Sequence, residues 1–223
     1  MMPDPGRRNR RSRPRGRPAG EDALDVRAAL LAAARERFLE RSYRDVSVRE
    51  LAAAVGVNAA MVRYYFGDKQ GLYAAMLQEV LGPLAGRIEG MLATPGDRAP
   101  DLPGFLRAYM QTAAAHPWLP RLILRDVLAP GGAFRDRFIE QFAGRLAPKV
   151  AELAGRPRKG SPSPSLDPRL TVVSLLSLGL WPFLAMPLLE RALGLEPDEA
   201  GIERLIEHTV KFFQAGLSAG ARP

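Results

Sequence analysis

Two short amphipathic segments separated by a glycine constrain the fold of this chain more than any other feature, and they lie within residues 47–66. Ser47 stands three residues before Glu50, which is the Ser-x-x-Glu pattern of a capping box at a helix start. Apolar residues then recur at positions 48, 51, 52 and 55, and Gly56 follows at once. The pattern predicts a helix of about two turns that ends at this glycine.

A further short helix is expected after Asn58, whose side chain can cap the first turn. Helical spacing turns Val62, Tyr65 and Phe66 toward a core. It leaves four residues facing outward: Ala59, Ala60, Arg63 and Tyr64. Two short helices joined by a glycine-containing turn predict a helix-turn-helix.

The other segments for which the sequence predicts regular structure are all helical. Val26, Leu30, Ala34 and Phe38 recur at four-residue spacing and predict a helix from Asp25 to about Arg41. A long helix is expected from Gln70 to Leu92, with a bend at Gly82-Pro83. Further helices are expected over 102–116, 118–128, 133–154, 168–193 and 198–217, and no strand pattern competes with them. The predicted fold class is therefore all-α, with about nine helices.

The positive charge is concentrated at the N-terminus. Seven arginines and a single aspartate in the first 20 residues supply +6 of the formal net charge of +8. We expect residues 1–22 to be a disordered basic tail with a polyanionic partner, nucleic acid first and an anionic membrane surface second. Arg13, Arg15 and Arg17 lie in an Arg-Pro-Arg-Gly-Arg-Pro run that looks like the core of an AT-hook. This run can either insert into an A·T minor groove or be attracted to DNA phosphates in general.

Several functional classes are disfavoured by composition. The absence of cysteine excludes disulfides, thiolate zinc sites and cysteine nucleophiles. His116 and His208 are the only histidines, and neither a nucleophile motif nor a phosphate-binding glycine loop is present. We therefore expect that the protein is not an enzyme and that it binds neither a metal nor a cofactor. No signal peptide fits the start of the chain, which favours the cytoplasm.

One segment has the length and composition of a membrane span. Leu170 to Leu189 is a run of 20 residues without a charge. Pro182 and Pro187 lower its quality as a span, so a buried helix is the better interpretation. The alternative function is therefore that of a membrane-surface or membrane-anchored helical protein, which would bind the membrane through this segment and the basic tail.

The segment from Asp25 to Leu77 resembles the tetracycline-repressor (TetR) family of transcriptional regulators. The resemblance lies in the segment VSVRELAAAVGVNAAMVRYYFGDKQGLYAAML. It includes the Gly-Val turn, the Tyr-Tyr-Phe run that ends the third helix and the lysine before the fourth helix. Three positions depart from the family. Ser42 stands where the family usually has glycine, Arg63 where it often has tyrosine, and Ala59 where it often has a polar residue. These departures leave fold and class untouched, but they prevent any transfer of an operator sequence.

The resemblance implies a division into a helix-turn-helix domain (23–69), an effector-binding and dimerisation domain (70–218) and a short tail (219–223). A recognition helix presents its early residues to base edges in the major groove. Arginine pairs with guanine and asparagine with adenine, while alanine can touch only apolar edges. The expected base-reading residues are Arg49, Asn58, Ala59, Ala60 and Arg63. The resemblance assigns DNA phosphates to Ser47, Tyr64 and Lys69.

The larger domain is expected to form a homodimer and to bind a small apolar effector. Residues 168–193 are apolar nearly all round, which requires cover on every side. In a four-helix bundle between two copies, the expected interface residues are Leu176, Leu180, Leu184, Ile202, Leu205, Ile206, Val210 and Phe213. The expected effector pocket is lined by Phe105, Tyr109, Met110, Trp118, Phe138, Phe142, Trp181 and Met186. The family usually represses transcription from a near-palindromic double-stranded DNA operator.

Overall fold

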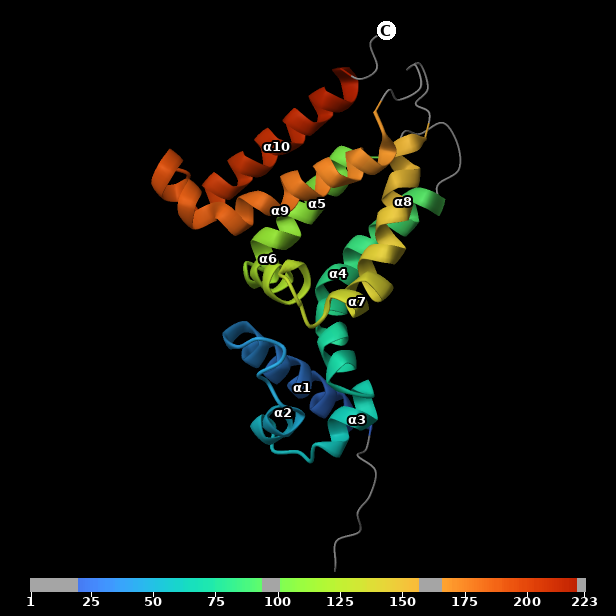
Figure 1. Ribbon diagram of the computed structural model, residues 1–223, viewed down its shortest axis with the longest axis vertical. Helices are drawn as coiled ribbons and strands as arrows, with labels where there is room; N and C mark the ends of the chain where they lie inside the picture. The colour runs from blue at the N-terminus through green and yellow to red at the C-terminus, as the bar shows by residue number, and fades with distance from the viewer. Residues whose placement is uncertain (1–19, 94–100, 157–165, 220–223) are drawn as a thin grey trace, which may run out of the picture.

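The computed structural model describes residues 20–93, 101–156 and 166–219, and all regular structure within these ranges is helical (Figure 1). The arginines expected to contact DNA from the tail, Arg13, Arg15 and Arg17, lie outside the described residues. The elements in chain order are α1 (Gly20–Glu40), α2 (Val48–Ala54), α3 (Ala60–Phe66), α4 (Lys69–Ala93), α5 (Leu102–Ala115), α6 (Trp118–Ile123), η1 (Leu124–Leu128), α7 (Arg135–Phe138), η2 (Ile139–Ala143), α8 (Gly144–Gly155), α9 (Pro168–Leu193) and α10 (Glu199–Ala219).

Most helix ends lie within about two residues of the sequence predictions, because local caps set them. The start of α1 does not: the helix begins at Gly20, whereas a helix from Asp25 and a disordered tail up to residue 22 were expected. The side chains of Asp101 and Asp167 accept backbone hydrogen bonds at the starts of α5 and α9. Gly56 follows α2 with a φ of 71°, the left-handed conformation that the sequence predicted for this glycine. The expected all-α fold is confirmed, and consecutive elements of the described chain join into nine continuous helical segments.

Two segments depart from α-helical geometry. η1 and η2 are π-helical and continue α6 and α7 without a break. The amide of Ala129 donates to the carbonyl oxygen of Leu124, five residues earlier, at 2.8 Å. Such π-turns are frequent at functional sites. The sequence predicted plain helices here, since periodicity does not distinguish the two geometries.

The first three helices form a small unit at one end of the molecule (Figure 1). Leu30, Ala34 and Phe38 of α1 are fully buried, as predicted, and they pack with Leu51 of α2 and Val62 of α3. Helix α4 begins in this unit, runs unbroken through Pro83 and enters the larger helical body. One helix therefore contributes to both parts of the molecule.

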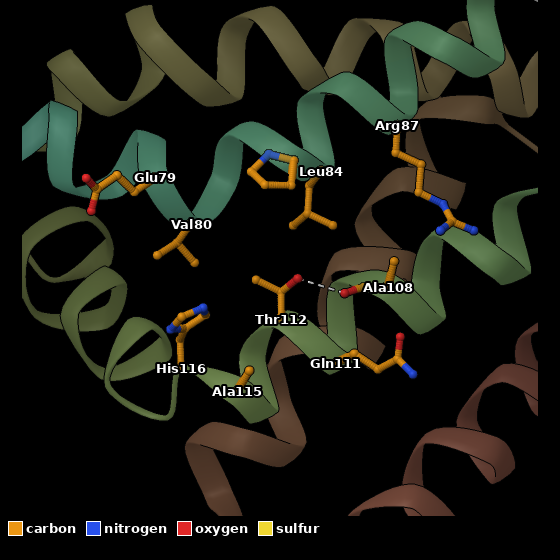
Figure 2. A pocket seen from close by; sticks show the side chains of 10 residues that line it. Glu79, Val80, Leu84, Arg87, Ala108, Gln111, Thr112, Ala115 and His116 are labelled. Carbon is orange, nitrogen blue, oxygen red and sulfur yellow. Dashed lines mark hydrogen bonds between the residues drawn. The ribbon is translucent and has the colours of Figure 1, made fainter.

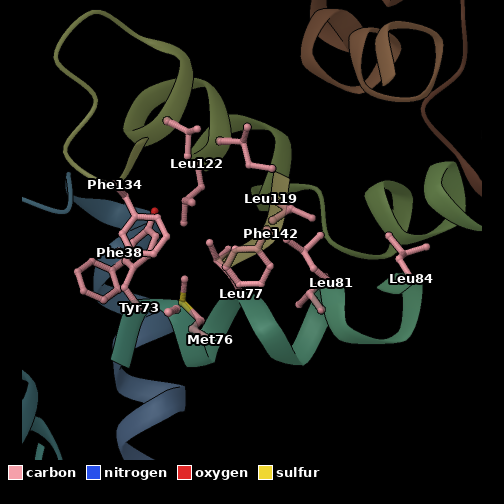
Figure 3. Close-up of a cluster of buried hydrophobic side chains, with 14 of the residues drawn as sticks. Phe38, Tyr73, Met76, Leu77, Leu81, Leu84, Leu119, Leu122, Phe134 and Phe142 are labelled. Atoms are coloured by element: carbon pink, nitrogen blue, oxygen red, sulfur yellow. The ribbon is translucent and has the colours of Figure 1, made fainter. Parts of the chain in front are cut away.

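The core along α4 is continuous from one part to the other. Figure 3 shows Phe38, Tyr73 and Phe134 gathered at its start, with Leu77 and Leu81 further along the same helix. The α4 leucines lie opposite residues from α6 and η2, namely Leu119, Leu122 and Phe142. In the larger body α5 packs between α9 and α10, and α8 lies between α4 and α9 (Figure 1).

Candidate functional site

The outer face of α2 and α3 carries two arginines without a partner. Arg49 and Arg63 are exposed, and neither makes an ion pair or a side-chain hydrogen bond within the described part of the chain. Neighbouring arginines differ in this respect, since Arg35 pairs with Glu79 at 3.0 Å and Arg41 with Glu50 at 2.6 Å. Tyr64 is also outward, with 59% of its surface exposed. These groups leave a basic and aromatic surface open to a ligand.

Two predicted contact residues also cap the helices that carry them. The hydroxyl of Ser47 accepts a hydrogen bond from the amide of Glu50 at 3.1 Å. The side-chain oxygen of Asn58 accepts from the amide of Ala60 at 2.8 Å, while its amide nitrogen stays free. The reciprocal half of the capping box is not formed, because the Glu50 carboxylate binds Arg41 instead.

The small residues at the start of α3 divide between the two faces. Ala60 is exposed as predicted, whereas Ala59 is half-buried and packs against the core, so it offers less methyl surface than the sequence suggested. Tyr65 and Phe66 are partly buried and pack against the core, which the helical spacing predicted. Burial on this inner face fixes the orientation of Arg63 and Tyr64.

Lys69 makes contacts that its predicted phosphate role did not include. Its ammonium donates to the carbonyl oxygens of Tyr43 at 2.7 Å and Val46 at 2.8 Å. It also lies 4.3 Å from the centre of the Tyr43 ring. Partial burial lowers the pKa of this lysine, and the carboxylate of Asp45 acts in the opposite direction. Lys69 therefore ties the start of α4 to the connection between α1 and α2.

A cavity of about 590 Å³ lies in the larger body between α4, α5, α8 and α9. Its wall is almost entirely aliphatic and aromatic, with Tyr109 and Ser177 as the polar exceptions. Five of the predicted pocket residues line it: Phe105, Tyr109, Phe138, Phe142 and Trp181. The other three do not. Met110 is fully buried in the core, Trp118 packs beside His116, and Met186 lies elsewhere on α9.

Sequence reasoning missed the contribution of α4 and of η1. Leu81, Leu84 and Ile88 of α4 line the cavity, as do Ile123 and Leu128 at either end of η1. The prediction favoured aromatic and methionine side chains, so these aliphatic residues were not among the expected pocket residues. The spacing of three and four residues between Leu81, Leu84 and Ile88 was a usable indication, because it places them on one face of α4.

Tyr109 is the notable polar group of this cavity. Its hydroxyl has no hydrogen-bond partner among the described residues, and burial raises its pKa to about 12. Its ring lies against Gly179 of α9, where a Cβ atom would stand 2.4 Å from the ring carbon Cδ1. The glycine therefore makes room for the tyrosine, which stays a neutral hydrogen-bond donor at physiological pH.

A second hollow of about 550 Å³ lies between α4 and α5 (Figure 2). Glu79 and Arg87 stand at its two ends, and both are already paired, with Arg35 and Asp101 respectively. The hydroxyl of Thr112 donates to the carbonyl oxygen of Ala108 at 2.8 Å. Three polar side chains of this hollow, those of Glu79, Arg87 and Thr112, therefore already have partners within the chain.

The predicted dimer residues fall into two groups. Ile206, Val210 and Phe213 are buried within one chain, because this face of α10 packs against α5. Packed in this way, these three side chains leave little surface for a second copy of the chain. Ile202 and Leu205 are half-buried, and Leu176, Leu180 and Leu184 lie along the cavity wall, with Leu176 also 44% exposed.

An unpartnered apolar surface lies on the exposed face of α9, and Trp181 belongs both to this surface and to the cavity wall. Large apolar side chains with more than half of their surface exposed recur along it at helical spacing: Leu170, Val173, Trp181 and Leu188. Phe212 of α10, exposed to 63%, was not predicted. Pro168–Leu193 is also the one helix of the described residues that is long and apolar enough to cross a membrane. Since its other face packs on α5 and α8, the membrane alternative is not favoured.

Comparisons with known proteins agree with this architecture. A family model described as bacterial regulatory proteins of the tetR family matches residues 30–76. The HTH-type transcriptional repressor Rv3405c of Mycobacterium tuberculosis is 33% identical over 195 residues, which covers 84% of this chain and 85% of that protein. The HTH-type transcriptional regulator RutR of Escherichia coli is 25% identical over 143 residues, or 63% of this chain, and the match spans only 66% of its length.

A solved structure extends the likeness to the whole fold. The structure of NalD, the secondary repressor of the MexAB-OprM multidrug efflux pump in Pseudomonas aeruginosa, matches with a TM-score of 0.64 and 24% identity. The match covers 88% of this chain and 98% of NalD. With the helix-turn-helix, the all-helical body and these relatives in agreement, the chain belongs to the tetR family of bacterial regulatory proteins.

Proposed function

We propose that this protein is a cytoplasmic transcriptional repressor that binds a near-palindromic operator as a homodimer and leaves it when an effector binds. The observation that carries this proposal is the exposed, unpaired pair Arg49 and Arg63 on the outer face of the helix-turn-helix. An arginine held on a rigid helix without an internal partner is free to bind guanine through two hydrogen bonds. The relatives of this chain are transcriptional regulators, which agrees with this role and not with an enzyme.

In the proposed complex each group on this face has one task. Arg49 and Arg63 form hydrogen bonds to base edges. Asn58 donates to a base edge through its amide nitrogen, because its side-chain oxygen already binds Ala60. Ala60 contacts apolar edges such as a thymine methyl. Tyr64 and the hydroxyl of Ser47 grip phosphates. Lys69 contacts a phosphate only if it gives up its bonds to Tyr43 and Val46, so we assign it the structural role first. Arg13, Arg15 and Arg17 add affinity from the tail, in the minor groove or along the phosphates.

The dimer is proposed to form through α9. Its exposed stripe of Leu170, Val173, Trp181 and Leu188 is apolar surface that monomers in water rarely display. A second copy related by a twofold axis covers the same stripe on both chains. That symmetry presents two copies of α3 to successive major grooves, about 34–36 Å apart.

The cavity of about 590 Å³ is proposed as the effector site. Its volume falls within the range of small-molecule pockets, and its wall favours a largely apolar effector. The Tyr109 hydroxyl supplies one hydrogen bond to an acceptor on that molecule. The effector acts by favouring a conformer in which α4 moves and the two copies of α3 no longer match both half-sites.

Selection of bound duplexes from a random pool tests the central claim. The expected result is a palindromic consensus with half-sites one helical turn apart, bound by a dimer. A control with Arg49 and Arg63 both replaced by alanine should select no consensus while it keeps the wild-type helical content. If the wild-type protein prefers no duplex over random sequence, the proposed function is wrong.

A further inference from the structure

Asp126 is the one charged residue among the described residues that the fold buries, with only 3% of its surface exposed. A buried carboxylate is costly unless it is fully hydrogen-bonded. Its Oδ2 accepts from the Tyr73 hydroxyl at 2.8 Å, and its Oδ1 accepts from the backbone amide of Tyr43 at 3.4 Å. The adjacent Arg125 supplies a charge partner, with its Nη2 at 2.9 Å from Oδ2.

These bonds join parts of the molecule that are distant in sequence. Tyr73 stands in the first turns of α4 and Tyr43 in the connection between α1 and α2, whereas Asp126 belongs to η1 of the larger body. Arg125 also donates to the carbonyl oxygen of Phe38, in the last turn of α1, at 2.6 Å. Two consecutive residues of η1 thus hold α1, its following loop and α4 together.

Aromatic packing surrounds the same carboxylate. Figure 3 shows Phe38, Tyr73 and Phe134 in one group, and the rings of Tyr73 and Phe134 have centroids 4.4 Å apart. The amide of Phe134 donates to the backbone oxygen of Asp126 at 3.0 Å. Burial and the negative charge of Asp126 raise the pKa of Tyr73, so its hydroxyl remains a donor.

The opposite side of this segment reaches the apolar cavity. Ile123 and Leu128 both line that cavity, and they flank Arg125 and Asp126 in the chain. A molecule that enters the cavity therefore contacts a backbone segment whose other side is bonded to the helix-turn-helix. Packed segments of this kind shift between discrete arrangements and do not deform continuously.

We propose that the Arg125–Asp126 pair is a latch: it holds the helix-turn-helix in its DNA-binding position, and a molecule that displaces Ile123 or Leu128 releases it. Asp126 is in this sense a positioning residue for the repressor activity, and the inference rests on the proposed function. Coupling between two sites is reciprocal. DNA bound at α3 must therefore tighten the segment from Ile123 to Arg135.

Hydrogen exchange on the full chain tests the latch with Tyr73→Phe, which removes the bonded hydroxyl and keeps the ring. We expect the amides of residues 38–46 to exchange about tenfold faster, while those of α9 and α10 keep their wild-type rates. Tyr43→Phe is the matched control, because it deletes a phenol oxygen from the same cluster without removing a latch bond. Asp126→Asn serves as a second variant if Tyr73→Phe fails to fold.

The second arm adds the duplex of highest affinity selected from the random pool. In the wild type, saturation with this duplex should slow exchange over residues 123–135, and in Tyr73→Phe this slowing should fall by at least half. In this second arm the latch is refuted if duplex binding leaves amide exchange over residues 123–135 of the wild type unchanged, or if it slows that exchange equally in the wild type and in Tyr73→Phe. In the first arm it is refuted if the amides of Tyr73→Phe exchange faster over the whole chain. If no duplex is preferred, the proposed function fails, but the first arm still decides whether the latch holds the two parts together.

Discussion

The ammonium nitrogen of Lys69 lies 2.7 Å from the carbonyl oxygen of Tyr43, 26 residues earlier in the chain. This bond, with its companion to Val46 at 2.8 Å, joins the start of α4 to the loop before α2. Among the described residues, neither carbonyl oxygen accepts a hydrogen bond from a backbone amide. The stability of the DNA-binding unit therefore depends on a residue whose sequence position suggests a phosphate contact.

Lys69→Met should lower the free energy of unfolding by about 1–2 kcal/mol, because it leaves two carbonyl oxygens without their donor and keeps the aliphatic stem. Urea denaturation followed by circular dichroism measures the change. Arg63→Met, at an exposed and unpaired position, should change stability by less than about 0.5 kcal/mol. Wild-type stability combined with lost operator affinity in Lys69→Met would assign this lysine to a phosphate instead.

Arg63→Ala should weaken binding to the selected consensus by about 1–3 kcal/mol and relax the preference at one position in each half-site. The reason is the loss of a bidentate contact to a base edge. Fluorescence anisotropy on the consensus and on a set of single-base variants measures both effects. Arg145→Ala, on α8, is the control and should leave both unchanged. An equal loss on every duplex would make Arg63 a phosphate contact.

Leu188→Glu should raise the dissociation constant of the dimer at least about tenfold, because a carboxylate would be buried in an apolar interface. Leu188 is 62% exposed in the single chain, so the substitution should leave the monomer folded. Sedimentation velocity over a range of concentrations measures the dissociation. Leu39→Glu is the matched control, since Leu39 is also an exposed leucine, at 41%, but lies on α1. A dimer unaffected by the change at Leu188 would exclude this part of α9 from the interface.

Gly179→Ala should destabilise the protein by about 1–3 kcal/mol through overpacking. The added Cβ would lie 2.4 Å and 2.6 Å from two ring carbons of Tyr109, so the ring must move into the cavity. Gly86→Ala is the control on α4, where nothing lies within 4 Å of the added atom. That change should stabilise the helix by about 0.5–1 kcal/mol. Chemical denaturation of both variants compares them, and a neutral Gly179→Ala would show that Tyr109 has room elsewhere.

The stability of the protein should fall between pH 10 and pH 12, in part because of Tyr43. Burial, assisted by the charge of Asp68, raises the pKa of Tyr43 from 10.0 to about 12. The folded state thus keeps a proton that the unfolded chain releases above pH 10, and the contribution is complete below that value. Tyr43→Phe should lose less stability across this window. Parallel slopes of unfolding free energy against pH in the two proteins would contradict the assignment.

The sequence was sufficient where local interactions decide the structure. Ser47, Asp101 and Asp167 cap helices with bonds to amides within three residues, and Gly56 ends α2 by its own backbone preference. These effects need no knowledge of the rest of the chain. The starts of α2, α5 and α9 followed from them, and the outward position of Arg63 followed from helical spacing.

Long-range packing decided what the sequence left open. Both faces of α10 offer apolar residues, and only contact with α5 shows that Ile206, Val210 and Phe213 face inward. The bond between Asp126 and Tyr73 spans 53 residues, and the bond from the Tyr43 amide spans 83. No periodicity encodes such a pairing, so this buried carboxylate was not among the predicted functional residues.

The apolar stripe on α9 should make the stability of the folded chain depend on its concentration. An isolated chain bears the free-energy cost of Leu170, Val173 and Trp181 in water, and any association that covers them stabilises the folded state by mass action. The thermal midpoint should then rise with protein concentration. A low concentration of the protein would lower both the stability of the fold and the occupancy of the operator. The concentration of the protein would then itself regulate transcription.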